Sequence, residues 1–211
     1  MWINRRSRLV VVMVVVGGLA CVAWWYRRDH YPITNAHPRG SRLIALGDSL
    51  TFGSGADRGE DYVSQLSRRL GVEILNKGVP GDTTGDALER LDEDALRLDP
   101  KIVILLIGGN DFLQRLSSER MFENIDRIVT RVQNEGALVV LVGMKAPLGL
   151  GEGGFRKIAR RRGCLYVRNV LRGILGNRTL MADQIHPNGA GYALMAERIA
   201  EVVRPYLRSS E

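Results

Sequence analysis

The sequence predicts an α/β fold: a three-layer α/β/α sandwich around a five-stranded parallel sheet, preceded by an N-terminal transmembrane helix. Five short apolar runs alternate with segments of helical periodicity, which is the order that builds a parallel sheet with right-handed crossovers. The run at residues 102–107 is apolar throughout, as in a central strand covered by helices on both faces. Residues 9–26 contain no charged side chain and are rich in valine, which predicts the transmembrane helix.

The N-terminal apolar run has 18 residues, enough to cross a hydrocarbon core. Three arginines precede it, and two arginines with one aspartate follow it, so the positive-inside rule leaves the N-terminus in the cytoplasm and exports the domain. We therefore predict a cytoplasmic basic segment at 1–8, a transmembrane signal anchor or signal peptide at 9–26, a tether at 27–41 and one folded domain at 42–211.

Three fates of the apolar run stay open. It is retained as an anchor, or it is cleaved after the small residues of Gly18-Leu19-Ala20, or Cys21 is lipidated. Gly18 and Leu19 depart from the residues that a bacterial lipobox has at these positions.

The positive charge lies mostly beside the apolar run. The first forty residues carry a net charge of +5 and the remainder only +2, so the charge pattern gives little support to nucleic-acid binding. An Arg/Lys run at 156–162 is interpreted as a solvated helix face, with attraction to anionic lipid headgroups as a second interpretation. The two cysteines, Cys21 and Cys164, predict neither an internal disulfide nor a zinc site.

The first half of the domain contains two strands and two helices. We expect a strand at 43–46, a helix at 59–70 that ends at Gly71, and a strand at 72–76. Thr83 and Asp86 form a capping-box pair for one helix that continues to residue 98, before Asp99-Pro100 ends it.

The second half repeats the alternation. After the strand at 102–107 we expect a helix over 121–132 closed by Gly136, a strand at 137–142, a flexible loop at 149–154, the arginine-rich helix and a strand at 165–170. The final helix begins at the N-cap Asn188, and its predicted inward residues are Tyr192, Met195, Ile199, Val202 and Tyr206.

Polar residues follow the strands at the edge where such folds keep their chemistry. Ser49, in Gly47-Asp48-Ser49-Leu50, is the candidate nucleophile. His186 is the one histidine of three that lies in the domain, and Asp183 stands three residues before it. Such a carboxylate can hold Nδ1 of the imidazole while Nε2 takes the serine proton. Asp48 is expected to hold the loop.

Two further residues are candidate donors to an oxyanion. The backbone N–H of Gly81 and the side-chain amide of Asn110 would join the N–H of Ser49 around the negative charge of a tetrahedral intermediate. Each residue alone is also an ordinary turn residue, but together they form one constellation at one edge.

Four ordered blocks resemble those of the SGNH, or GDSL, hydrolases: Gly47-Asp48-Ser49-Leu50, Asn76 with Gly78 and Gly81, Gly108-Gly109-Asn110-Asp111, and Asp183-Gln184-Ile185-His186-Pro187. Their surroundings look most like the bacterial thioesterase I, arylesterase and lysophospholipase branch. The resemblance covers about residues 42–206 and implies a flavodoxin-like domain. It also implies Ser49 as nucleophile, His186 as base, Asp183 as its orienter, and Gly81 and Asn110 in the oxyanion hole. It is weakest at 112–117 and 144–154, which shape the acyl pocket in that branch.

The resemblance and the residues together predict a serine esterase that cleaves carboxylic esters or thioesters, including lysolipids, without a metal or organic cofactor. The expected location is the bacterial cell envelope: anchored in the inner membrane with the domain in the periplasm or outside, or secreted if the signal is cleaved. Deacetylation of an envelope glycan remains an alternative, as does a non-catalytic envelope protein that binds a ligand. A phosphate-binding module is disfavoured because neither a Walker pattern nor Gly-x-Gly-x-x-Gly follows any strand.

Overall fold

The computed structural model describes residues 31–145 and 152–207. The chain divides into two compact units, Met1–Pro32 and Ile33–Glu211, and the sheet lies in the second. The predicted cytoplasmic segment and the predicted transmembrane helix at 9–26 lie outside the described residues, as do residues 149–151 of the loop predicted at 149–154. Within the described ranges no helix is both long enough and apolar enough to span a bilayer.

The predicted five-stranded parallel sheet is confirmed. Its strands are β1 (Arg42–Gly47), β2 (Ile74–Gly78), β3 (Pro100–Leu106), β4 (Leu138–Val142) and β5 (Leu165–Val167), in the order β2-β1-β3-β4-β5. All neighbours are parallel, with Ile44 opposite Leu75 on one side and Val103 on the other. This order changes direction at β1, so the loops after β1 and β3 diverge and leave a crevice at the carboxyl edge.

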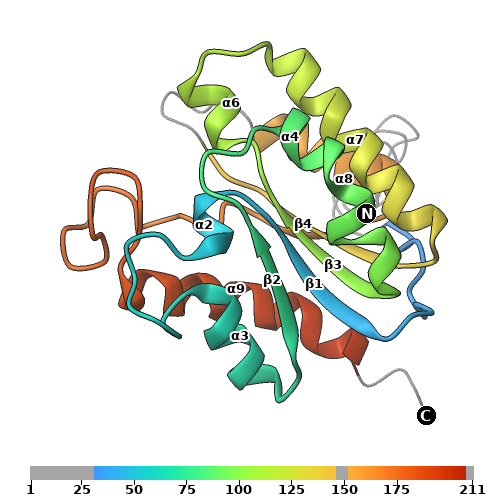
Figure 1. Ribbon diagram of the computed structural model, residues 1–211, viewed down its shortest axis with the longest axis horizontal. Helices are drawn as coiled ribbons and strands as arrows, with labels where there is room; N and C mark the ends of the chain where they lie inside the picture. The colour runs from blue at the N-terminus through green and yellow to red at the C-terminus, as the bar shows by residue number, and fades with distance from the viewer. Residues whose placement is uncertain (1–30, 146–151, 208–211) are drawn as a thin grey trace, which may run out of the picture. The chain divides into compact units, whose positions relative to one another are not determined.

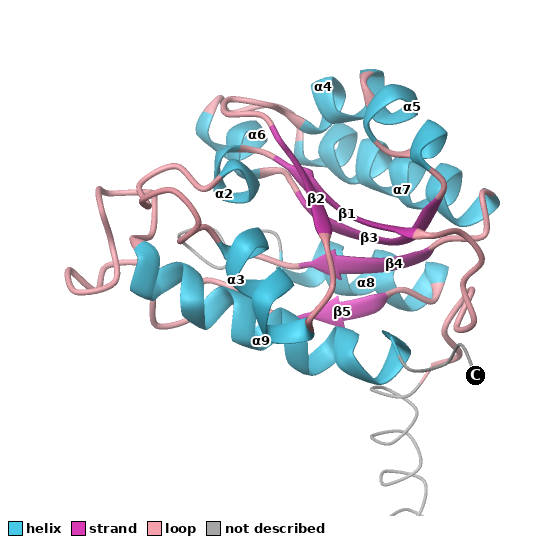
Figure 2. Ribbon diagram, turned by 60° about the horizontal axis from the view of Figure 1, so that its bottom comes forward, coloured by secondary structure: helices cyan, strands magenta, loops and turns pink. Residues whose placement is uncertain are grey.

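Helices cover both faces of the sheet (Figures 1 and 2). On one face, α3 (Tyr62–Leu70) packs against α9 (Gly189–Leu207). On the other, α7 (Ser118–Asn134) contacts both α4 (Thr84–Glu89) and α8 (Glu152–Arg162). The middle strands β3 and β4 are buried almost completely, which explains why their sequences are apolar without alternation.

The predicted helix caps are confirmed where the structure describes them. Gly71 ends α3 in the left-handed conformation, as predicted. The helix begins at Tyr62 rather than residue 59, and its N-cap Asp61 accepts from the N–H of Ser64. Thr83 and Asp86 form the capping box of α4. Asn188 accepts from the N–H of Gly191 at the start of α9. These local hydrogen bonds satisfy end groups that a helix cannot pair internally.

Several element bounds differ from the prediction. Strand β2 ends at Gly78 rather than residue 76, and β5 ends at Val167 rather than residue 170. The single helix expected up to residue 98 is three pieces: α4, α5 (Leu91–Asp94) and the 3₁₀ turn η1 (Leu96–Leu98). Ala87, Leu91 and Ala95 are all buried, so the pieces keep the spacing of one helix and periodicity cannot separate them.

Two helices differ in detail from the sequence prediction. Helix α8 begins at Glu152, so Gly153 and Gly154 are helical rather than part of a loop. A Cβ on Gly154 would lie 2.2 Å from the ring of Phe122, which is why the close contact between α8 and α7 needs glycine there. In α9, Val203 is buried while Val202 and Tyr206 are only half-buried.

Residues 33–41, which fall within the predicted tether, make hydrogen bonds to the folded unit. The N–H of Thr34 donates to the carbonyl of Gly163 over 2.9 Å. The side chain of Asn35 donates to the carbonyls of Gln133 and Ala137, each over 2.9 Å. This stretch therefore lies against the ends of α7 and α8.

Candidate active site

Ser49 lies at the point where β1 gives way to α2 (Ser49–Phe52), a single helical turn at the carboxyl edge of the sheet. Asp48 caps this turn: its carboxylate accepts from the N–H of Leu50 over 3.0 Å. The first N–H groups of a helix have no partner within it, so the N–H of Ser49 is not bonded within the turn. The expectation that Asp48 holds the loop is confirmed by this cap.

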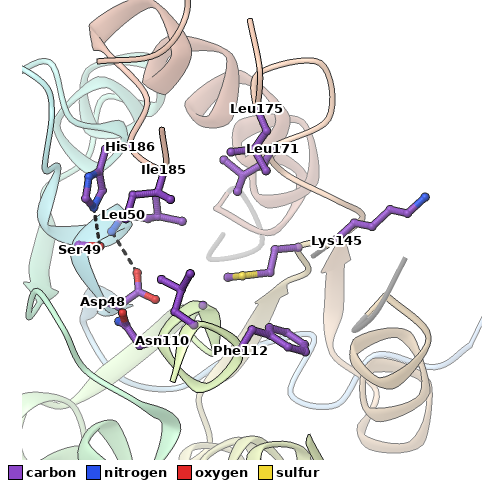
Figure 3. Close-up of a pocket in the computed structure, with 13 residues that line it drawn as sticks. Asp48, Ser49, Leu50, Asn110, Phe112, Lys145, Leu171, Leu175, Ile185 and His186 are labelled. Atoms are coloured by element: carbon purple, nitrogen blue, oxygen red, sulfur yellow. Dashed lines mark hydrogen bonds between the residues drawn. The ribbon is translucent and has the colours of Figure 1, made fainter. Parts of the chain in front are cut away.

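A chain of hydrogen bonds joins three of the predicted residues (Figure 3 draws its Ser49–His186 link). Nε2 of His186 lies 3.1 Å from Oγ of Ser49, and Nδ1 lies 2.7 Å from Oδ2 of Asp183. Ser49 and His186 are 137 positions apart in the chain, and the fold brings them into contact.

Asp183 is positioned by its own loop. Its Oδ1 accepts from the N–H groups of Ile185 and His186 over 2.8 and 2.7 Å, while its Oδ2 faces the imidazole. These bonds, that to His186 first, lower the pKa of Asp183 to about 2. The group is therefore a carboxylate at neutral pH and can accept a hydrogen bond from Nδ1–H of His186.

The two further oxyanion candidates lie in neighbouring loops. Asn110, in α6 (Gly109–Leu113), lines the same cavity as Ser49 and His186, and its amide donates to the carbonyl of Asp82 over 2.8 Å. An amide has two N–H donors, so this bond fixes its orientation and leaves a second donor. Gly81 immediately precedes Asp82 but is not among the residues that line the cavity.

Arg90 connects the loop after β2 with the end of β1, and it was not among the predicted site residues. Its Nε donates to the carboxylate of Asp82 over 2.6 Å, and its Nη2 donates to the carbonyl of Gly47 over 2.9 Å. The loop after β2 is thereby held against the end of β1, beside Asp48 and Ser49. The one signal in the sequence was the position of Arg90, one helical turn after the capping box.

A second buried contact fixes α6. Both carboxylate oxygens of Asp111 accept from Thr84, one from its N–H over 2.9 Å and one from its hydroxyl over 2.7 Å. Asp111 is buried, so these charge-assisted bonds hold the start of α4 against α6 and with it Asn110.

The cavity beside Ser49 has a volume of about 130 Å³ and mostly apolar walls. Its apolar side chains come from four parts of the chain: Leu50, Phe112, Leu113, Met144, Leu171, Leu175 and Ile185. The resemblance implied that the segments around Phe112 and Met144 shape the pocket, whereas no pattern in the sequence indicated Leu171 and Leu175. Both lie in an irregular stretch after β5 that has no period to indicate which side chains point inward.

No group of three or more His, Cys, Asp or Glu side chains in the described part of the chain is arranged to hold a metal ion. The polar groups that line the cavity are the hydroxyl of Ser49, the imidazole of His186 and the amide of Asn110, with the carboxyl of Asp48 and the ammonium of Lys145. Together they can supply a nucleophile, a base and a hydrogen-bond donor, which are the parts that acyl transfer needs.

The chain is similar to a protein-family model, to curated proteins and to solved structures. The model of the GDSL-like Lipase/Acylhydrolase family matches residues 45–194. Esterase TesA of Pseudomonas aeruginosa is 28% identical over 178 residues, covering 78% of this chain and 89% of its own. An arylesterase of Vibrio mimicus is 24% identical over 188 residues, covering 83% and 94%. The crystal structure of AlinE4, an SGNH-hydrolase family esterase, superposes with a TM-score of 0.63 at 31% identity, covering 79% of this chain and 95% of that one.

Proposed function

Because the chain belongs to the GDSL-like lipase/acylhydrolase family, we propose that it cleaves carboxylic esters or thioesters by acyl transfer through Ser49, His186 and Asp183. The observation that carries this proposal is the unbroken hydrogen-bond chain from Asp183 through His186 to Oγ of Ser49, at the mouth of an apolar cavity.

In the first half of the reaction, Oγ of Ser49 attacks the carbonyl carbon while Nε2 of His186 takes the hydroxyl proton. Asp183 keeps the proton on Nδ1 and stabilises the imidazolium. The N–H groups of Ser49 and Gly81 and the amide of Asn110 donate to the oxyanion. His186 then gives its proton to the leaving alcohol or thiol, which departs and leaves an acyl-Ser49.

In the second half, His186 takes a proton from water, whose oxygen attacks the acyl carbon. The second tetrahedral intermediate collapses, Ser49 regains its proton from His186, and the carboxylic acid leaves. Each proton that Nε2 accepts is returned within the same half-reaction, so no cofactor is needed to balance the cycle.

The cavity favours a small acyl or aryl group. Its volume of about 130 Å³ is below the roughly 300–1,000 Å³ of pockets that enclose drug-sized ligands. Short aryl and acyl esters therefore fit inside, and a longer chain would continue over the exposed Leu113 and Leu175. An acetyl ester on an envelope glycan also meets the size limit and remains the second candidate.

Purified full-length protein in detergent tests the reaction on p-nitrophenyl acetate, butyrate and octanoate. Ser49→Ala and His186→Ala should each lower kcat by about 10⁴-fold or more, because the triad acts as a unit. Ser118→Ala removes an exposed hydroxyl at the first position of α7 and should keep the native rate. Equal rates in all four proteins would exclude ester hydrolysis through Ser49 and would favour a non-catalytic function in ligand binding. A panel of acetylated glycans then separates the two ester substrates.

We also propose that the domain is exported and tethered to the membrane. The support is the uncharged run at 9–26 with its excess of arginine on the N-terminal side. Protease added to spheroplasts should degrade the domain, and protection of the domain would contradict export. The mass of the mature protein distinguishes retention, cleavage before Cys21 and lipidation of Cys21.

A further inference from the structure

The exposed apolar side chains of the folded unit gather at one edge. Among residues 31–145 and 152–207, six large apolar side chains are exposed, by between 40% and 61%. We call these six the apolar rim: Phe52, Val79, Leu113, Leu116, Leu175 and Ile185. Every one of them follows the carboxyl end of a strand: β1, β2, β3 or β5. This is the edge that carries Ser49, and α2 and α6 both lie on that side of the sheet (Figure 2).

The rim continues into the catalytic cavity. Leu113, Leu175 and Ile185 are exposed to solvent and also line the cavity beside Ser49. In Figure 3, Ile185 and Leu175 lie on the same side of the cavity as His186, and Phe112 lies opposite them. An apolar acyl chain can therefore pass from outside the protein to Ser49 along a continuous apolar surface. Large exposed apolar patches of this kind mark sites of interaction with a partner or a membrane.

Cations alternate with the rim. The segments after β3, β4 and β5 carry five exposed cations, Arg115, Lys145, Arg168, Arg172 and Arg178. Among the described residues of these three segments, the one exposed acid is Asp183, which is bonded to His186, while the segment after β1 adds the exposed Asp57, Arg58 and Glu60. Arg115 stands between Leu113 and Leu116, and Arg172 and Arg178 flank Leu175.

This excess of cations is local, because residues 41–211 as a whole carry a net charge of only +2. The arginine-rich end of α8, which the sequence analysis considered for lipid contact, is different: Arg161 and Arg162 both pair with Asp126. The catalytic edge therefore combines a local excess of exposed cations with the apolar rim.

We propose that the catalytic edge docks on the surface of a bilayer that contains anionic phospholipid. The apolar rim enters the boundary between headgroups and acyl chains, and Arg115, Lys145 and Arg178 contact the phosphates. Amphipathic surfaces with this mixture of apolar and basic side chains bind the interface plane, with a strength set by apolar area and anionic lipid together. Docking places the mouth of the cavity against the lipid phase.

A fluorescent label on each edge of the sheet tests this orientation. The full-length protein, with Cys21→Ser, receives Leu116→Cys or Arg69→Cys and an environment-sensitive thiol label; Cys164 is buried and should not react. Arg69 is exposed at the far end of α3, which leads to the amino edge of the sheet. The proteins are reconstituted in vesicles of phosphatidylcholine alone or with phosphatidylglycerol.

The label at position 116 should shift to the blue and brighten about twofold or more when phosphatidylglycerol is present, while the label at 69 stays in water. The double variant Arg115→Gln with Arg178→Gln should lower the ratio of docked to undocked protein, as reported by the label at 116. The expected decrease is about fivefold for each cation removed. Arg69→Gln with Arg127→Gln removes the same charge elsewhere and should leave the 116 signal unchanged.

Two outcomes overturn the proposal. Emission at 116 that stays characteristic of water in both vesicles excludes docking on lipid. A shift that depends on protein concentration and is the same in both vesicles indicates pairing of two copies instead. Ser49→Ala should dock as the native protein does, so the result is independent of whether the ester hydrolysis proposed above is found.

Discussion

At the scale of single residues, the site contains two aspartates in opposite environments. Asp183 is exposed and bonded to three N–H groups, which lower its pKa to about 2. Asp48 is 2% exposed, and this burial, with a smaller contribution from Asp82, raises its pKa to about 6. The neighbour of Ser49 is thus a carboxyl that titrates near neutral pH, while the partner of His186 stays ionised.

The raised pKa of Asp48 predicts a loss of stability with rising pH. Between its unfolded value of 3.8 and about 6, the folded protein binds the proton more tightly than the unfolded chain. The free energy of unfolding therefore falls by about 2–3 kcal/mol as the pH rises through this range. Asp48→Asn keeps an oxygen for the N–H of Leu50 and removes the titration.

Urea unfolding followed by circular dichroism at pH 4 and pH 8 measures this effect. From pH 4 to pH 8, the free energy of unfolding of Asp48→Asn should rise by about 2–3 kcal/mol relative to that of the native protein. For Asp57→Asn, at an exposed position, the same relative change in the free energy of unfolding should be less than about 0.5 kcal/mol. A pH-independent difference between Asp48→Asn and the native protein would contradict the assignment.

At the scale of elements, the position of Ser49 depends on the contact between α2 and the end of β2. The side chain of Asn76 donates to the carbonyl of Thr51 over 2.8 Å and accepts from the N–H of Gly78 over 2.9 Å. A Cβ on Gly78 would lie 2.1 Å from the backbone nitrogen of Phe52. Glycine at 78 is thus what allows the helical turn of Ser49 to rest directly on the second strand.

We expect Gly78→Ala to displace α2 and impair both stability and activity. Overpacking of this kind costs about 1–3 kcal/mol, and a displaced nucleophile should lower kcat by about 10-fold or more on p-nitrophenyl butyrate. Gly153→Ala is the matched control, because a Cβ there meets no atom within 4 Å and alanine favours a helix. Native kcat and native melting temperature in Gly78→Ala would show that α2 is not fixed by this contact.

At the scale of the whole molecule, the tryptophans offer a probe of the N-terminal segment. All three, Trp2, Trp24 and Trp25, lie within the first 30 residues, and two stand at the end of the apolar run. If that run spans a bilayer, their emission should be blue-shifted in vesicles and quenched by lipids brominated near the headgroup, because tryptophan prefers the interface.

The expected result is about twofold quenching by bromine near the glycerol and less by bromine at the chain ends. Protein cleaved before Cys21 keeps Trp24 and Trp25 but loses the run, so its emission should stay that of water. This comparison checks the membrane prediction without relying on enzyme activity. Emission typical of water from the uncleaved protein would contradict a transmembrane segment.

The sequence alone was sufficient for the order of elements, the sheet class and five candidate residues of the site. Strand and helix periods, caps such as Thr83 and Asn188, and the blocks around Ser49 and His186 are local signals that one stretch of chain carries by itself. The constellation could be predicted because every parallel strand ends at one edge, so residues after strand ends must meet.

Only the tertiary structure identified the contacts that hold those residues. The links of Arg90 to Gly47, of Asp111 to Thr84, and of Gly78 to α2 join segments far apart in the chain, and no local period records them. The same holds for Leu171 and Leu175 in the cavity wall and for the apolar rim. Burial and hydrogen bonding between distant segments depend on packing, which a sequence read one stretch at a time does not contain.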